Sequence, residues 1–174
     1  MDDLIPFASR EYFFFLVLLT VARALDFFST WVATPHLVLE GNPLARRLGW
    51  KWGSLLNLAL CVGFAFSPMT AIILSTTSVL VAARNFHSAW LMRSMGESEY
   101  RFLVSDQLHR SGKGLYLGCM YAQALLTAAV GVGIVAFSGD LLVPVSIGLG
   151  VVAYGFAVAF FSTLSVWRIG RGGG

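Results

Sequence analysis

The most informative shortage in this 174-residue chain is its shortage of charge. Charged residues make up 12% of the chain, whereas soluble domains carry about 25%. Hydrophobic residues make up 57%, and several apolar runs are longer than the core helices of a soluble protein need to be. The composition therefore argues against a soluble globular domain and is typical of a membrane protein.

Cysteine and the usual cofactor motifs are also scarce. The two cysteines, Cys61 and Cys119, both fall within apolar runs, so no disulfide is expected. The chain lacks the spacings His-x-x-x-His and Cys-x-x-Cys, and it has neither a phosphate-binding glycine loop nor a serine nucleophile elbow. The cofactor, if there is one, stays unknown from the sequence.

The N-terminus lacks the basic segment that opens a secretory signal peptide, because Asp2 and Asp3 come first. The first apolar run is also longer than the apolar core of a signal peptide, which has about 7–15 residues. We therefore expect this run to be retained as a membrane span.

Five apolar segments are predicted to cross a membrane, since about 20 helical residues suffice. They are residues 12–33, 54–66, 69–92, 114–137 and 141–166, of which the second is short. Residues 93–113 mix charged and apolar side chains and predict an amphipathic helix on the membrane surface. The predicted fold is all-α. It forms a single membrane domain over residues 1–174, with a three-span module at 12–92, a cytoplasmic segment at 93–113 and a helical hairpin at 114–167.

The basic residues predict an orientation. They lie mainly after the first and third spans and at the C-terminus, which five crossings place on one side of the membrane. The positive-inside rule then puts the N-terminus outside and the C-terminus inside. This pattern assigns the net charge of +3 to loops beside a membrane and not to nucleic-acid binding. It predicts contact with anionic lipid headgroups through Arg46, Arg47, Lys51, Arg93, Arg101, Arg110 and Lys113.

Polar side chains gather near the predicted cytoplasmic boundary. A charge at the bilayer centre costs about 2.5–3.5 kcal/mol and needs a partner or a cavity. Arg23 and Asp26 are three residues apart and can pair, and Arg84 is the other candidate partner of Asp26. On the third span, Asn85 is expected to point away from the face that Arg84 shares with His87. The candidate site comprises Asp26, Thr30, Glu40, Asn42, Arg84 and His87.

Two interpretations of this cluster stay open. In the first, the cluster packs helices or binds a lipid or a protein partner. In the second, the chain is a membrane-embedded enzyme or carrier, with Asp26 as proton acceptor, Glu40 as acid or base and His87 as proton relay. The same three residues are weak candidates for a metal site, and His36 with His87 for haem ligation.

Small residues recur on the fourth span. Gly114, Gly118 and Ala122 follow one another at four-residue intervals, which lets helices approach closely within one chain or between chains. A homo-oligomer or a partner in a membrane complex therefore stays open.

A short motif adds a resemblance. Asp26-x-x-x-Thr30, followed by Glu40-x-Asn42-Pro43, resembles a family of small prokaryotic membrane proteins catalogued as a domain of unknown function. The resemblance covers about residues 12–90. It implies a three-span module, a prokaryotic plasma membrane, and a single site that holds Asp26, Thr30, Glu40 and Asn42, but no activity.

Overall fold

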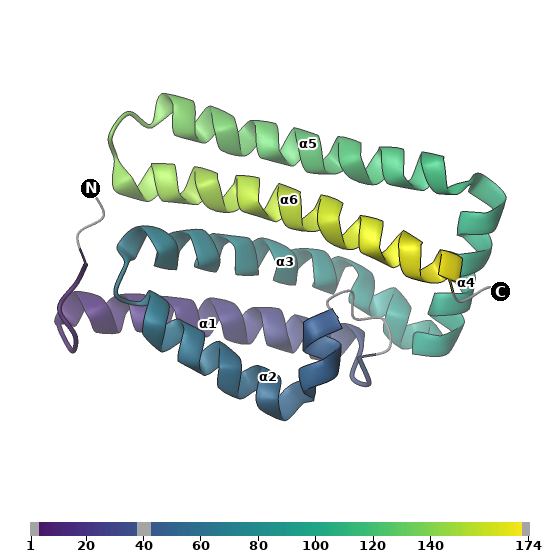
Figure 1. The fold of residues 1–174 in the computed structure, drawn as a ribbon, viewed down its shortest axis with the longest axis horizontal. Coiled ribbons are helices and arrows are strands. Elements are labelled where there is room, and N and C mark those ends of the chain that lie inside the picture. The colour runs from purple at the N-terminus through teal and green to yellow at the C-terminus, as the bar shows by residue number, and fades with distance from the viewer. Residues whose placement is uncertain (1–3, 38–42, 172–174) are drawn as a thin grey trace.

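The computed structural model describes residues 4–37 and 43–171, and these residues are all-helical, as predicted. Six helices follow one another along the described chain (Figure 1). They are α1 (Arg10–Ala33), α2 (Pro43–Phe64), α3 (Pro68–Met95), α4 (Glu97–Ser111), α5 (Lys113–Phe137) and α6 (Leu142–Arg171).

Four of these helices are long and apolar enough to cross a membrane. They are α1, α3, α5 and α6, and they contain most of the predicted spans at 12–33, 69–92, 114–137 and 141–166. Their outward faces carry large exposed apolar side chains, such as Phe137 and Leu125. The chain therefore has the helices of a multi-pass membrane protein.

Helices α1 and α3 run in the same direction. The contacts between α1 and the later chain advance together along both: they join Arg23 to Ser78, Thr30 to Asn85 and Thr34 to Glu97. Helix α2 follows α1 and precedes α3 in the chain, and it runs in the opposite direction to both. Its contacts with α1 and with the segment after α1 show this, because they join Tyr12 to Val62, Arg23 to Asn57 and Pro35 to Trp50. The chain thus returns along α2 before α3 begins (Figure 1).

A kink divides α2. Gly49 has a φ of 65°, in the left-handed region that favours glycine. It separates a first part that carries Arg46 and Arg47 from an apolar part that begins at Trp50. Residues 54–64 of the span predicted at 54–66 therefore belong to a longer, bent helix, which is not among the four helices long and apolar enough to cross a membrane.

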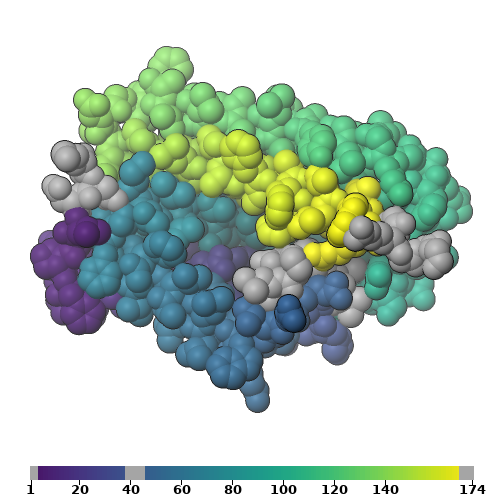
Figure 2. Space-filling model, in the orientation of Figure 1, coloured from purple at the N-terminus to yellow at the C-terminus, as the bar shows by residue number. Residues whose placement is uncertain are grey.

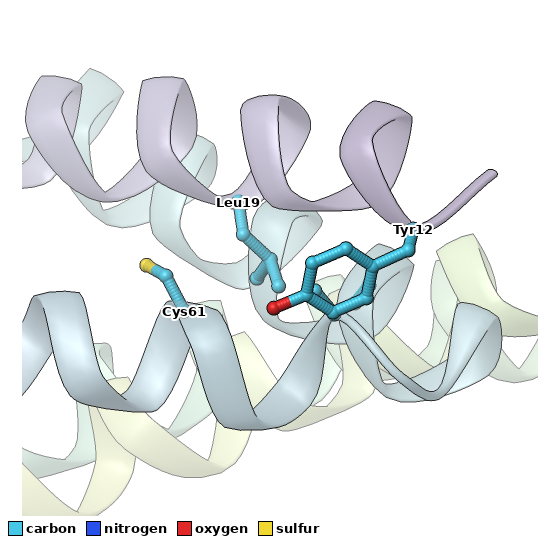
Figure 3. Packing of buried hydrophobic residues seen from close by; sticks show 5 residues of the cluster. Tyr12, Leu19 and Cys61 are labelled. Carbon is cyan, nitrogen blue, oxygen red and sulfur yellow. The ribbon is translucent and has the colours of Figure 1, made fainter. Parts of the chain in front are cut away.

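A small core holds α1, α2 and the start of α3 together at the end where α1 begins. Tyr12 and Leu19 of α1 point toward α2 and pack with Cys61, and all three are at least 96% buried (Figure 3). The phenol of Tyr12 also donates to the backbone oxygen of Val62 at 3.2 Å. This core fixes one end of the bundle and leaves the polar cluster nearer the other.

Glycines bring α6 very close to α5 and α3. A Cβ added at Gly148 of α6 would lie 2.7 Å from the backbone oxygen of Gly131 in α5, and one at Gly150 would lie 2.7 Å from Cβ of Thr76 in α3. By contrast, a Cβ at Gly118 would meet no described atom within 4 Å. The predicted stripe on the fourth span is therefore not what packs α5 against α6, because its Gly118 faces open space.

We call the end of the bundle where α1 and α3 finish the basic end. Helix α4 crosses this end and packs against α3 and α5 (Figure 1). Four of the basic residues expected to meet lipid headgroups lie on α4 or beside it: Arg93, Arg101, Arg110 and Lys113.

Candidate functional site

Arg23 is the centre of a polar cluster that joins three helices. Its Nη1 lies 2.8 Å from Oδ2 of Asp26, whose side chain is only 15% exposed. It also donates to Oγ of Ser78 in α3 at 3.0 Å. Its Nε and Nη2 both donate to the amide oxygen of Asn57 in α2, with Nε at 2.7 Å. Because a charge without partners is costly at membrane depth, these contacts favour one arrangement of α1, α2 and α3.

A second set of hydrogen bonds joins α1 to α3 further toward the basic end. Nδ2 of Asn85 donates to Oγ1 of Thr30 at 3.1 Å and to Oγ of Ser29 at 3.2 Å. Ser29 is fully buried and donates in turn to the backbone oxygen of Asp26 at 2.8 Å. Asn85 therefore belongs with Asp26 and Thr30, and His87 is exposed elsewhere on α3.

Three members of these networks are absent from the candidates found in the sequence: Asn57, Ser78 and Ser29. Asn57 carried the clearest signal, because it is the one amide within a run of leucine and alanine. The hydroxyls carried none, since serine in a membrane helix commonly bonds to its own backbone.

A cavity of about 870 Å³ lies beside the polar cluster, and all six described helices contribute to its lining, α5 through Tyr116. Asp26 is the only carboxylate among the described residues that line it. Five arginines line the same cavity: Arg23, Arg46, Arg84, Arg101 and Arg168. Because Arg23 is paired with Asp26, the described lining residues keep an excess of positive charge.

Arg84 has few acceptors for its donors. A guanidinium carries five N–H donors. Within the described residues, Arg84 uses one of them, because its Nη2 donates to the thioether sulfur of Met120 at 3.6 Å. A thioether is a weak acceptor. Asp26, the partner considered from the sequence, forms its ion pair with Arg23. Arg84 is thus a half-buried cation suited to an anion in the cavity.

Helix α4 closes the basic end of the cavity. Glu97 at its start accepts from Oγ1 of Thr34 at 2.6 Å and from the backbone N–H of His36 at 3.0 Å. Further along α4, Tyr100 and Arg101 line the cavity. Burial raises the pKa of the Tyr100 phenol, so it stays protonated and can donate a hydrogen bond. Helix α4, which lies within the segment predicted at 93–113 to be an amphipathic helix, therefore also forms part of the cavity wall.

The other predicted site residues are not brought to this cavity by the described structure. Glu40 and Asn42 lie outside the described residues. His87 does not line the cavity, and His36 lies 3.0 Å from Glu97 through its Nδ1. Across the described ranges 4–37 and 43–171, no three His, Cys, Asp or Glu side chains gather as metal ligands.

No protein-family model, no curated protein and no solved structure matches this chain. The resemblance of the segment from Asp26 to Pro43 to a family of small membrane proteins therefore remains a proposal that the motif alone carries.

Proposed function

We propose that this chain is a five-span protein of a prokaryotic plasma membrane that binds a phosphate-class anion in the cavity at its basic end. In this proposal the N-terminus lies outside and the basic end faces the cytoplasm. The parallel course of α1 and α3 supports five crossings, because a chain that crosses twice in one direction must return in between, and α2 lies there.

One observation carries the binding role, namely the charge imbalance of the cavity. Arg46, Arg84, Arg101 and Arg168 line it, and none of them forms an ion pair with another described residue. Arginines placed together around one cavity repel one another, and an anion bound between them removes that repulsion. Phosphate suits such a set, because a guanidinium binds two of its oxygens at once.

The polar cluster has a separate, structural part in this proposal. The side chains of Arg23 and Asn85 donate hydrogen bonds to other side chains of the same protein. They hold the helices that form the walls of the cavity. The anion is bound by Arg84 and by the arginines near the basic end. The alternative of an enzyme with His87 as a proton relay gains no support, since His87 lies away from the cavity.

The test measures the thermal unfolding of protein purified in an uncharged detergent. Inorganic phosphate, or a phospholipid with net negative charge such as phosphatidylglycerol, is added at constant ionic strength. A ligand at 100 times its Kd stabilises the folded state by about 2.7 kcal/mol, and for a protein of this size 1 kcal/mol raises Tm by roughly 2–4 °C.

We expect at least one of the two probes to raise Tm for the wild type, and Arg84→Gln to lose most of the rise. Arg93→Gln is the matched control, because Arg93 is exposed at the end of the same helix and does not line the cavity. The proposal is wrong if neither probe raises Tm, or if the two variants lose the effect equally.

A further inference from the structure

We infer that two copies of this chain pair in the membrane along one exposed face of α5, with the Gln123 amides of the two copies hydrogen-bonded to each other. We call this face the α5 seam, and its residues are Cys119, Gln123, Leu126, Val130, Gly133 and Phe137. None of these residues lines the cavity, so the pairing is independent of the proposed anion site.

Helix α5 lies at one edge of the bundle. It packs on α6 along its length and on α4 at the basic end (Figure 1). In the space-filling view, its green side chains form the upper border of the molecule (Figure 2). Only 11% of its apolar window is buried, against 17% to 33% in the other three described helices that can span a membrane. Helix α5 therefore has the largest share of its surface left for lipid or for a partner.

The spacing of the α5 seam is that of a helix–helix interface. Its residues follow one another at intervals that alternate between four and three, as in the heptad pattern that keeps one stripe of a helix facing a parallel neighbour. All of them are exposed except Gly133, and a Cβ added at Gly133 would meet no described atom within 4 Å. Lipid alone could cover an apolar stripe, so the polar member of the seam decides what covers this one.

Gln123 is that polar member. It lies about 15 Å along the helix from Lys113, so it falls near the middle of a hydrocarbon layer about 30 Å thick. Neighbouring hydroxyls bond within the chain, Tyr121 with Thr163 at 2.7 Å and Thr127 with the backbone oxygen of Gln123 at 2.9 Å. The side-chain amide of Gln123 is exposed and bonds to no residue that the structure describes. Acyl chains offer neither donor nor acceptor, so this amide favours a protein partner.

A second copy of the chain supplies what the amide needs. Copies of a membrane protein insert in one orientation, so a two-fold axis between them runs across the membrane and brings each interface residue near its own counterpart at the same depth. A glutamine amide has both donors and an acceptor, so two Gln123 side chains can donate to each other. A single polar residue within an apolar seam also fixes the register and the number of helices.

The α5 seam leaves the contact with α6 intact. Ala124 and Gly131 are the buried residues of α5, and Gly131 lies against Gly148 of α6. Each residue of an α-helix turns by about 100°, so Gln123 and Val130 lie about 100° around α5 from that contact. The second copy therefore meets a different face of α5 and does not displace α6.

The first experiment cross-links the unaltered chain in its membrane. Cys119 belongs to the seam and is exposed, whereas Cys61 is buried in the core between α1 and α2. Copper–phenanthroline is added as oxidant, and dimer is measured by electrophoresis without reducing agent. In the control, Cys119→Ser is combined with Leu125→Cys, which moves the thiol to a position of α5 that is 72% exposed and outside the seam.

We expect the wild type to form a disulfide-linked dimer and the control to form several-fold less, because a disulfide requires Cα atoms within about 7 Å. No dimer in the wild type would overturn the inference. Equal yields in the two chains would also overturn it, because they would show chance collisions instead of a defined interface.

The second experiment measures the pairing equilibrium by sedimentation in an uncharged detergent matched in density to the solvent. We expect Gln123→Leu to weaken the dimer by roughly 10-fold, Gln123→Asn to keep most of the association because it keeps an amide, and Leu125→Ala to match the wild type. An unchanged dimer in Gln123→Leu, equal losses in Gln123→Leu and Leu125→Ala, or a larger oligomer in the wild type would overturn the inference. If Gln123→Leu does not fold, the cross-linking of the unaltered chain decides.

Discussion

Arg23 in α1 and Asn57 in α2 are joined by two hydrogen bonds that end on one amide oxygen, across 34 residues of sequence. Nδ2 of the same amide donates to the backbone oxygen of Gly53, so its oxygen is directed at the guanidinium. Much of the outer surface of α2 is exposed leucine. This pair is therefore a principal polar attachment of α2 to the bundle.

We expect Asn57→Ala to lower the free energy of unfolding by about 1.5–3 kcal/mol, because the charged guanidinium loses the acceptor of two donors. Thermal unfolding in detergent measures the effect. Ser54→Ala is the matched control on the same helix, since Oγ of Ser54 donates to the backbone of its own helix at Trp50. Equal stability of the two variants would show that the pair does not hold α2.

The contrast between Asn85 and His87 gives a second prediction. Asn85→Leu removes both hydrogen bonds to α1 and is expected to cost about 1–3 kcal/mol of stability, because two hydroxyls lose a partner. His87→Leu, two residues on, changes an exposed side chain and should stay within about 0.5 kcal/mol of the wild type. A larger loss at His87 than at Asn85 would contradict the geometry.

The third prediction concerns the close packing of α5 against α6. Gly148→Ala puts a methyl group 2.7 Å from the backbone oxygen of Gly131, so α5 and α6 must separate, at an expected cost of about 1–3 kcal/mol. Gly118→Ala adds the same methyl group where no described atom lies within 4 Å and should be neutral or slightly stabilising. Melting temperatures of the two variants decide the matter, and a neutral Gly148→Ala would disprove the close contact.

The fourth prediction concerns the hydrogen bonds that attach α4 to the segment after α1. Glu97→Ala removes the acceptor of Thr34 and His36, and we expect the amides of α4 to exchange with solvent roughly 10-fold faster as a result. Hydrogen exchange read by mass spectrometry resolves this helix from the others. Glu99→Ala is the control, because it removes an exposed carboxylate from the same turn of α4. If both variants exchanged at the same rate, Glu97 would not be what holds α4 in place.

The fifth prediction concerns membrane topology, and it tests whether α2 crosses the membrane. In a variant without Cys61 and Cys119, we expect Arg47→Cys and Ser111→Cys to react with a membrane-impermeant thiol reagent only after the cells are opened. Ser138→Cys should react in intact cells. If α2 did not cross the membrane, positions 47 and 111 would fall on opposite sides, because α3 would be the only crossing between them.

The local features of this protein were predictable from its sequence. Long apolar runs specify α1, α3, α5 and α6, because the backbone of such a segment must satisfy its own hydrogen bonds in lipid. The spacing of Arg23 and Asp26 likewise places both on one face of a helix, where they form an ion pair at 2.8 Å.

Only the tertiary structure decided which helices share the polar groups. The bonds from Arg23 to Asn57 and from Asn85 to Thr30 join different helices, and an apolar run does not encode which of its faces meets a neighbour. The cavity arises for the same reason. Its arginines come from α1, α2, α3, α4 and α6, so their common site exists only once the packing of those helices has brought them together.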